Sequence, residues 1–171
     1  HVLSSAASDV YKRQVITRKT AVLFAAGCYG AATLGGADQD TRRAMQEFGL
    51  NLGIAFQMID DVLDYEGDPA TMGKNVGDDL TEGKPTLPLI HVLREGTEQE
   101  QALVKRAISE KTAEDIVAVV AAVKRCGALD YTRTQARHYH DLALQRLQQL
   151  PQSPARSALE QITALSINRD H

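Results

Sequence analysis

Apolar residues recur at steps of three and four along one segment in the first half of the chain. They are Phe48, Leu52, Phe56, Ile59 and Leu63. This spacing is that of one face of an α-helix. Asp38 can cap the start of the helix, and Gly67 followed by Asp68 and Pro69 can end it. The pattern therefore predicts a helix of about 28 residues, ~42 Å long, which is typical of the central helix of a bundle.

Shorter helical patterns follow a polar, glycine-containing loop that extends from Asp68 to about Pro85. Their start signals are Pro88 in a first turn, a capping box from Thr97 to Glu100, a cap at Thr112, and Ser153 before Pro154. The expected helices are Thr86–Leu93, Thr97–Ser109, 112–127, 131–150 and a last one from Ser153. No window alternates as a β-strand does, and no fixed repeat is present. The fold class predicted is all-α, a helical bundle with short loops.

The most apolar stretch of the chain is Ala21–Gly36. It is shorter than the ~18 apolar residues that cross a membrane, and it contains several Gly and Thr residues. We therefore expect no transmembrane segment, and we interpret this stretch as a helix buried in the core.

Composition limits the class of protein. Hydrophobic residues make up 43% and charged residues 24%, which is ordinary for a globular domain and unlike a disordered chain. The net charge of −3 has the wrong sign for a nucleic-acid partner. The two cysteines, Cys28 and Cys126, match no metal-ligand spacing, and free thiols favour a cytoplasmic location.

The first residues do not continue the helical pattern. Ser4–Gln14 has no apolar periodicity and reads like the translation of a sequencing adapter. We expect residues 1–14 to be non-native and residues 15–171 to be part of a single all-α domain, a fragment whose gene begins further upstream. The alternative is a genuine polar N-terminal arm.

Three carboxylates lie in the second half of the long predicted helix. Asp60 and Asp64 share one helix face, and Asp61 lies about 100° around the axis. Because apolar residues flank all three, the helix is expected to be largely buried, and buried carboxylates need a cation. Oxygen ligands of this kind suit Mg²⁺, which commonly also binds substrate phosphates. The alternative is a solvated acidic face.

Polar residues elsewhere in the chain strengthen the interpretation of the three aspartates as part of a binding site. Gln57 precedes Asp60 by three residues, Lys74 and Lys84 each follow a glycine, and Lys19-Thr20 opens the apolar stretch. Lysines on glycine-rich loops can approach a diphosphate closely. Each lysine alone is more often a surface residue, but together these residues predict a site for a polyanion bridged by Mg²⁺.

These motifs resemble those of the trans-prenyltransferases, the polyprenyl diphosphate synthases, and in particular the long-chain bacterial kind such as the octaprenyl diphosphate synthases. The resemblance extends from about Val15 to the end of the chain and corresponds to the C-terminal half of the family's isoprenoid-synthase helical bundle. Lys19-Thr20 is similar to a lysine-threonine motif. Gln57 to Asp64 is similar to the second aspartate-rich motif, and Gly73-Lys74 and Gly83-Lys84 are similar to two later lysine motifs.

The resemblance implies a prenyltransferase that condenses isopentenyl diphosphate head-to-tail with an allylic diphosphate. It also implies roles for individual residues. Asp60, Asp61 and Asp64 would hold Mg²⁺ against the allylic diphosphate and serve as catalytic residues. The residues that would contact the diphosphate are Lys19, Thr20, Gln57, Lys74 and Lys84. A homodimer is expected for the full-length protein.

The resemblance is incomplete in one respect. The family carries a first aspartate-rich motif followed by arginines, and no such helical segment occurs in these 171 residues. We therefore expect the polypeptide to be inactive alone. The alternative functions are a non-catalytic subunit that binds a catalytic prenyltransferase partner, and a structural bundle; three intact aspartates argue against the first.

Overall fold

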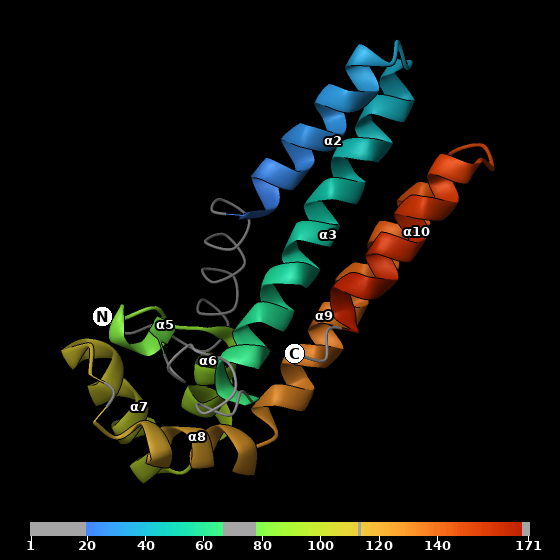
Figure 1. Cartoon of the computed structure of the whole chain (residues 1–171). Helices are drawn as coiled ribbons and strands as arrows, with labels where there is room; N and C mark the ends of the chain where they lie inside the picture. Colours follow the sequence, from blue (N-terminus) through green and yellow to red (C-terminus); the bar gives the residue numbers. More distant parts are fainter. Residues whose placement is uncertain (1–19, 67–77, 113, 169–171) are drawn as a thin grey trace. The chain divides into compact units, whose positions relative to one another are not determined.

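The computed structural model describes residues 20–66, 78–112 and 114–168, and every element within them is an α-helix (Figure 1). The predicted all-α fold class is confirmed, with no β-strand among these residues. The helices are α2 (Val22–Leu34), α3 (Gln39–Glu66), α5 (Asp78–Thr81), α6 (Leu87–Glu95), α7 (Glu98–Glu110), α8 (Ile116–Arg125), α9 (Ala128–Leu147) and α10 (Pro154–Ile167).

Several helix ends lie where the sequence predicts them. The long helix α3 has 28 residues, and the backbone N–H of Thr41 donates to Asp38 Oδ1 at 2.8 Å, the expected cap. Ser153 caps α10 by accepting from the Arg156 N–H at 3.1 Å. Thr112 does not cap α8, because its hydroxyl accepts from the N–H of Glu114 and the helix begins only at Ile116.

The chain divides into two compact units, and the division falls inside α3, after Ile59, and inside α9, after Arg133. The described part of the first unit, residues 60–66, 78–112 and 114–133, holds α5 to α8, the end of α3 and the start of α9. The described part of the second holds α2, the rest of α3 and α9, and α10.

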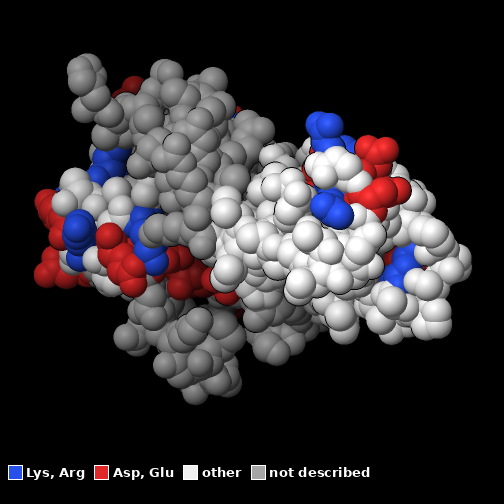
Figure 2. All heavy atoms as spheres, turned by 90° about the horizontal axis from the view of Figure 1, so that it is seen from above, with Lys and Arg blue, Asp and Glu red and all other residues white. Residues whose placement is uncertain are grey.

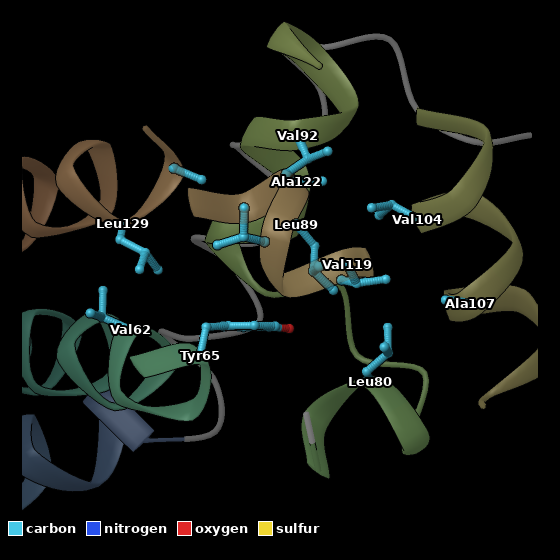
Figure 3. Close-up of a cluster of buried hydrophobic side chains, with 12 residues drawn as sticks. Val62, Tyr65, Leu80, Leu89, Val92, Val104, Ala107, Val119, Ala122 and Leu129 are labelled. Carbon is cyan, nitrogen blue, oxygen red and sulfur yellow. The ribbon is translucent and has the colours of Figure 1, made fainter. Parts of the chain in front are cut away.

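Mostly aliphatic side chains form the core of the first unit (Figure 3). Each of its described helices contributes to it. The largest members include Val62, Tyr65, Leu80, Leu89, Val92, Val104, Val119, Val123 and Leu129. This packing holds the end of α3, which carries Asp60, Asp61 and Asp64, in the same unit as α5 and α6, which flank Lys84.

The second unit packs α2 against α3 and α9 against α3 and α10. Phe48, Leu52, Ala143 and Leu147 are buried together, and Phe24 packs against them. The prediction of a buried helix over Ala21–Gly36 is wrong for the described chain. Within α2 only Ala25 is buried, whereas Leu23 is 74% exposed and Leu34 is 92% exposed. The apolar side chains of α2 itself lie on all sides of the helix. The described residues cover only the side that faces α3.

None of the described helices combines the length and the apolar character needed to cross a membrane. On the face that Figure 2 shows, acidic and basic side chains lie intermixed. Beside them is a broad surface region, drawn in white, that has no charged side chain.

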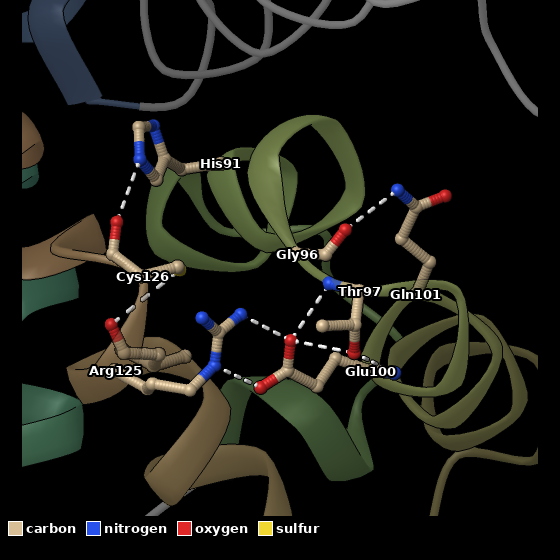
Figure 4. A network of polar contacts seen from close by, with 8 residues as sticks. His91, Gly96, Thr97, Glu100, Gln101, Arg125 and Cys126 are labelled. Carbon is tan, nitrogen blue, oxygen red and sulfur yellow. Dashed lines mark hydrogen bonds and ion pairs between the residues drawn. The ribbon is translucent and has the colours of Figure 1, made fainter.

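A polar network joins α6, α7 and α8 in the first unit (Figure 4). The predicted capping box is present: Glu100 N–H donates to Thr97 Oγ1, and the Thr97 N–H donates to Glu100 Oε2. The Arg125 guanidinium also donates to both oxygens of the Glu100 carboxylate. Mainly through this contact with Arg125, and also through the Thr97 N–H, the pKa of Glu100 falls to about 2.

His91 belongs to the same network and is buried. Its Nδ1 lies 3.0 Å from Arg94 Nη2, and its Nε2 lies 3.2 Å from the carbonyl oxygen of Cys126. Because a guanidinium can only donate, Nδ1 accepts and Nε2 donates to Cys126. The ring also stacks on Tyr131 at 4.5 Å. His91 therefore ties α6 to Cys126, the residue that ends α8.

The Glu100 network predicts a pH dependence. The carboxylate has a lower pKa in the folded than in the unfolded chain, so its contribution is complete above the ordinary value of 4.5 and disappears as the pH falls toward 2. We expect Glu100→Gln to lower the melting temperature at pH 6, and the difference from the unaltered chain to shrink steadily below pH 4.5. Thermal melts of both proteins from pH 2 to 6 measure it. A difference independent of pH would contradict this account.

Candidate functional site

The acidic cluster lies in the last two turns of α3. Asp60 and Asp64 are half-buried and lie on one helix face, as expected from their spacing. Asp61 is 1% exposed. Because the helix rotates about 100° per residue, its carboxylate leaves the chain in a different direction from that of Asp60.

Asp61 contacts the start of α6. Its Oδ2 accepts a hydrogen bond at 3.3 Å from the backbone N–H of Leu87, the first residue of α6. One turn further along α3, the Tyr65 hydroxyl lies 3.1 Å from the hydroxyl of Thr86. Both groups are buried, and burial raises the pKa of Tyr65 far above its ordinary value. The end of α3 therefore holds the start of α6 at two adjacent residues.

Lys84 lies just before this junction. Gly83 has φ +70°, a conformation that favours glycine, and it turns the chain out of α5 toward Lys84. The Lys84 ammonium contacts Glu82 and lies 2.9 Å from Asp79 Oδ1. Its pKa is raised, first by the hydrogen bond to Glu82 and then by that to Asp79. The side chain is 39% exposed, so an anion in solution can reach it.

Thr20 and Gln57 meet in the second unit. The Thr20 hydroxyl donates to Gln57 Oε1 at 3.0 Å. The contact joins the start of the α2 segment to α3, three residues before Asp60. Two other sequence-predicted site residues, Lys19 and Lys74, lie outside the described residues.

Sequence reasoning missed the partners of these residues. Asp79 and Glu82 are acidic residues in a segment expected to be loop, and the structure forms the short helix α5 there. Tyr65 and Thr86 carry no chemical motif. The one available signal was the position of Tyr65 four residues after Asp61, which places both on one face of the helix.

The donor chemistry of Asp60 and Asp64 fits a magnesium ion. Proteins commonly bind Mg²⁺ through one or two carboxylates. Water and substrate phosphate oxygens then complete the coordination shell of the ion. Among residues 20–66, 78–112 and 114–168, no three His, Cys, Asp or Glu side chains form a group that could hold a metal ion. Of the three aspartates, Asp60 and Asp64 share one face of α3, and the predicted ligand role of all three stays a prediction.

Comparison with known proteins identifies the family of this chain. The sequence profile described as "Polyprenyl synthetase" matches residues 4–125, more than two thirds of the chain. The chain belongs to the polyprenyl synthetase family. This confirms the family that the aspartate and lysine motifs indicate.

Relatives of known activity and structure agree. The chain is 41% identical over 158 residues to the octaprenyl diphosphate synthase of Escherichia coli, covering 92% of this chain and 49% of that enzyme. It is 42% identical over 161 residues to an all-trans-nonaprenyl-diphosphate synthase of Rhodobacter capsulatus, covering 94% and 49%.

A solved polyprenyl synthase from Caulobacter crescentus, complexed with calcium and isoprenyl diphosphate, superposes with a TM-score of 0.88. It is 37% identical in sequence, and the match covers 98% of this chain and 52% of that one. This polyprenyl synthetase chain thus spans about half the length of the relatives it matches.

Proposed function

We propose that this chain provides the allylic-diphosphate side of the active site of a Mg²⁺-dependent polyprenyl diphosphate synthase. The observation that carries the proposal is the pair of half-buried carboxylates, Asp60 and Asp64, on one face of α3 in a chain of the polyprenyl synthetase family. A relative that is 37% identical binds a divalent cation and an isoprenyl diphosphate, which supports the same ligand classes here.

The reaction proposed is head-to-tail condensation. The C–O bond of the allylic diphosphate breaks and its electrons leave with the diphosphate. The double bond of isopentenyl diphosphate then attacks the allylic carbon, and loss of a proton restores a double bond. Mg²⁺, held by Asp60 and Asp64 and by diphosphate oxygens, would neutralise the charge that develops on the leaving group.

By the resemblance to the family, each of the polar residues would contact the diphosphate. Lys84 already carries a full positive charge between Asp79 and Glu82, and it would exchange these carboxylates for phosphate oxygens. The Thr20 hydroxyl and the Gln57 amide are hydrogen-bonding groups at the start of α2 and on α3. Lys19 and Lys74 would add further positive charge.

Two broader properties belong to the same proposal. We place the protein in the cytoplasm, because the free thiols of Cys28 and Cys126 suit a reducing compartment. A homodimer is proposed for the full-length enzyme, with no nucleic-acid partner.

Turnover is best tested in a complete enzyme. Residues 15–171 would replace the matching half of the E. coli octaprenyl diphosphate synthase, and the chimera would be incubated with farnesyl diphosphate, radiolabelled isopentenyl diphosphate and Mg²⁺. We expect longer polyprenyl diphosphates from the chimera and none from the 171-residue chain alone. A folded chimera that binds Mg²⁺ and pyrophosphate but forms no product would contradict the proposal.

A further inference from the structure

The three aspartates of α3 differ in burial and in the helix face that they occupy. Asp61 is buried, and its Oδ2 accepts from the N–H of Leu87 at the start of α6. A buried carboxylate needs compensation, and the positive end of a nine-residue helix, together with the donated N–H, contributes to it. Asp60 and Asp64 are half-buried and share one face of α3, as two carboxylates that approach one ion must.

The start of α6 depends on this contact for its cap. Thr86 occupies the N-cap position but makes no side-chain hydrogen bond to its own helix. Its hydroxyl is instead paired with Tyr65 on α3. A residue 26 positions earlier in the chain therefore provides the cap that the local residue does not.

The same contact controls where Lys84 lies. Only Pro85 and Thr86 separate Lys84 from Leu87, and the proline ring fixes one of the intervening backbone angles. Because Asp61 and Tyr65 hold Leu87 and Thr86, the segment that carries Lys84 is fixed to the helix that carries Asp60 and Asp64.

We propose that Asp61 is a positioning residue: it caps α6 and holds the Lys84 segment against α3, while Asp60 and Asp64 are the metal ligands of the trio. The metal part rests on the proposed function. The capping part does not, so the two can fail separately.

The capping part is tested by hydrogen exchange on the 171-residue chain. Asn can accept the same hydrogen bond as Asp, whereas Ala cannot. We expect the Leu87 amide to keep its protection in Asp61→Asn and Asp60→Asn, and to exchange at least about tenfold faster in Asp61→Ala. The Val92 amide, inside α6, is the internal control. Unchanged protection of Leu87 in Asp61→Ala, or loss of protection in Asp61→Asn, would overturn the capping role.

The metal part is tested by calorimetric titration with Mg²⁺ and inorganic pyrophosphate. Asp60→Asn and Asp64→Asn should each weaken binding by more than about tenfold, and Asp61→Asn by less than about threefold. An equal loss in Asp61→Asn and Asp60→Asn would make Asp61 a ligand and overturn this assignment. If the unaltered chain binds no Mg²⁺–pyrophosphate, the metal assignment and the proposed site in this chain fail, and the exchange data still decide the cap.

A double-mutant cycle tests whether Asp61 acts through Lys84. Lys84→Gln should weaken pyrophosphate binding in the unaltered chain and have a much smaller effect in the Asp61→Ala background, because the lysine is then already misplaced. A purely structural role of Asp61 predicts additive effects, and additivity would overturn the positioning role.

Discussion

Replacing Asp60 with Asn in the chimeric enzyme should lower kcat/KM for farnesyl diphosphate by about 100-fold or more. Asn has nearly the same shape as Asp but carries no charge, so it is a poor ligand for a hard cation such as Mg²⁺. If the proposed ion were weakly held, the charge on the departing diphosphate would not be neutralised. Raising the Mg²⁺ concentration should recover part of the activity, because the loss is one of metal affinity.

The matched control is Glu110→Gln, which makes the same charge change at an exposed position at the end of α7. It should leave kcat/KM within about twofold of the unaltered chimera. If the acidic cluster were only a solvated face, Asp60→Asn would behave like the control. Asp60→Asn would then stabilise the fold by ~0.2–0.5 kcal/mol through relief of repulsion with Asp64. Equal activity of the two variants would therefore refute the metal site.

Local signals predicted the helices well. The cap at Asp38, the capping box at Thr97 and the Ser153 cap are each formed by residues within three positions of one another, so the sequence specifies them directly. Thr112 shows the limit of such signals: it has the chemistry of a cap, but the helix starts four residues later, at Ile116.

Contacts between distant residues were not predictable from spacing. The sequence grouped Asp61 with Asp60 and Asp64, because the three are adjacent in a motif. Its carboxylate is directed to Leu87, and no local pattern indicates that α6 begins beside it. Lys84 is another case: its contact with Asp79 depends on the fold of α5, a helix of four residues that carries no apolar period.

The prediction that α2 is buried was wrong for a related reason. Apolar composition predicts that a helix seeks partners, but the number of sides covered depends on the rest of the fold. On the covered side of α2, two glycines of α3 allow the two helices to approach each other closely. A Cβ atom at Gly49 would lie 2.5 Å from the backbone oxygen of Phe24, and one at Gly53 would lie 2.7 Å from the Cα of Ala21. The two backbones can approach this closely only because both positions lack a side chain.

Replacing Gly49 with Ala should therefore destabilise the protein by about 1–3 kcal/mol, although alanine is the better helix former. The added methyl group meets main-chain atoms of α2, which cannot rotate away as a flexible side chain could. Relief requires the helices to separate, and separation also moves Phe24 away from Phe56, whose ring lies 5.8 Å from it.

Gly27→Ala is the matched control, with the same chemical change on α2, where the new Cβ would have no atom within 4 Å. Helix propensity alone then acts, and we expect this variant to be more stable by up to ~1 kcal/mol. Urea unfolding at constant m-value measures both free energies of unfolding. Opposite signs for the two substitutions would show that α2 and α3 are in close backbone contact in solution. If Gly49→Ala were as stable as Gly27→Ala, the helices would have to lie further apart than the structure places them.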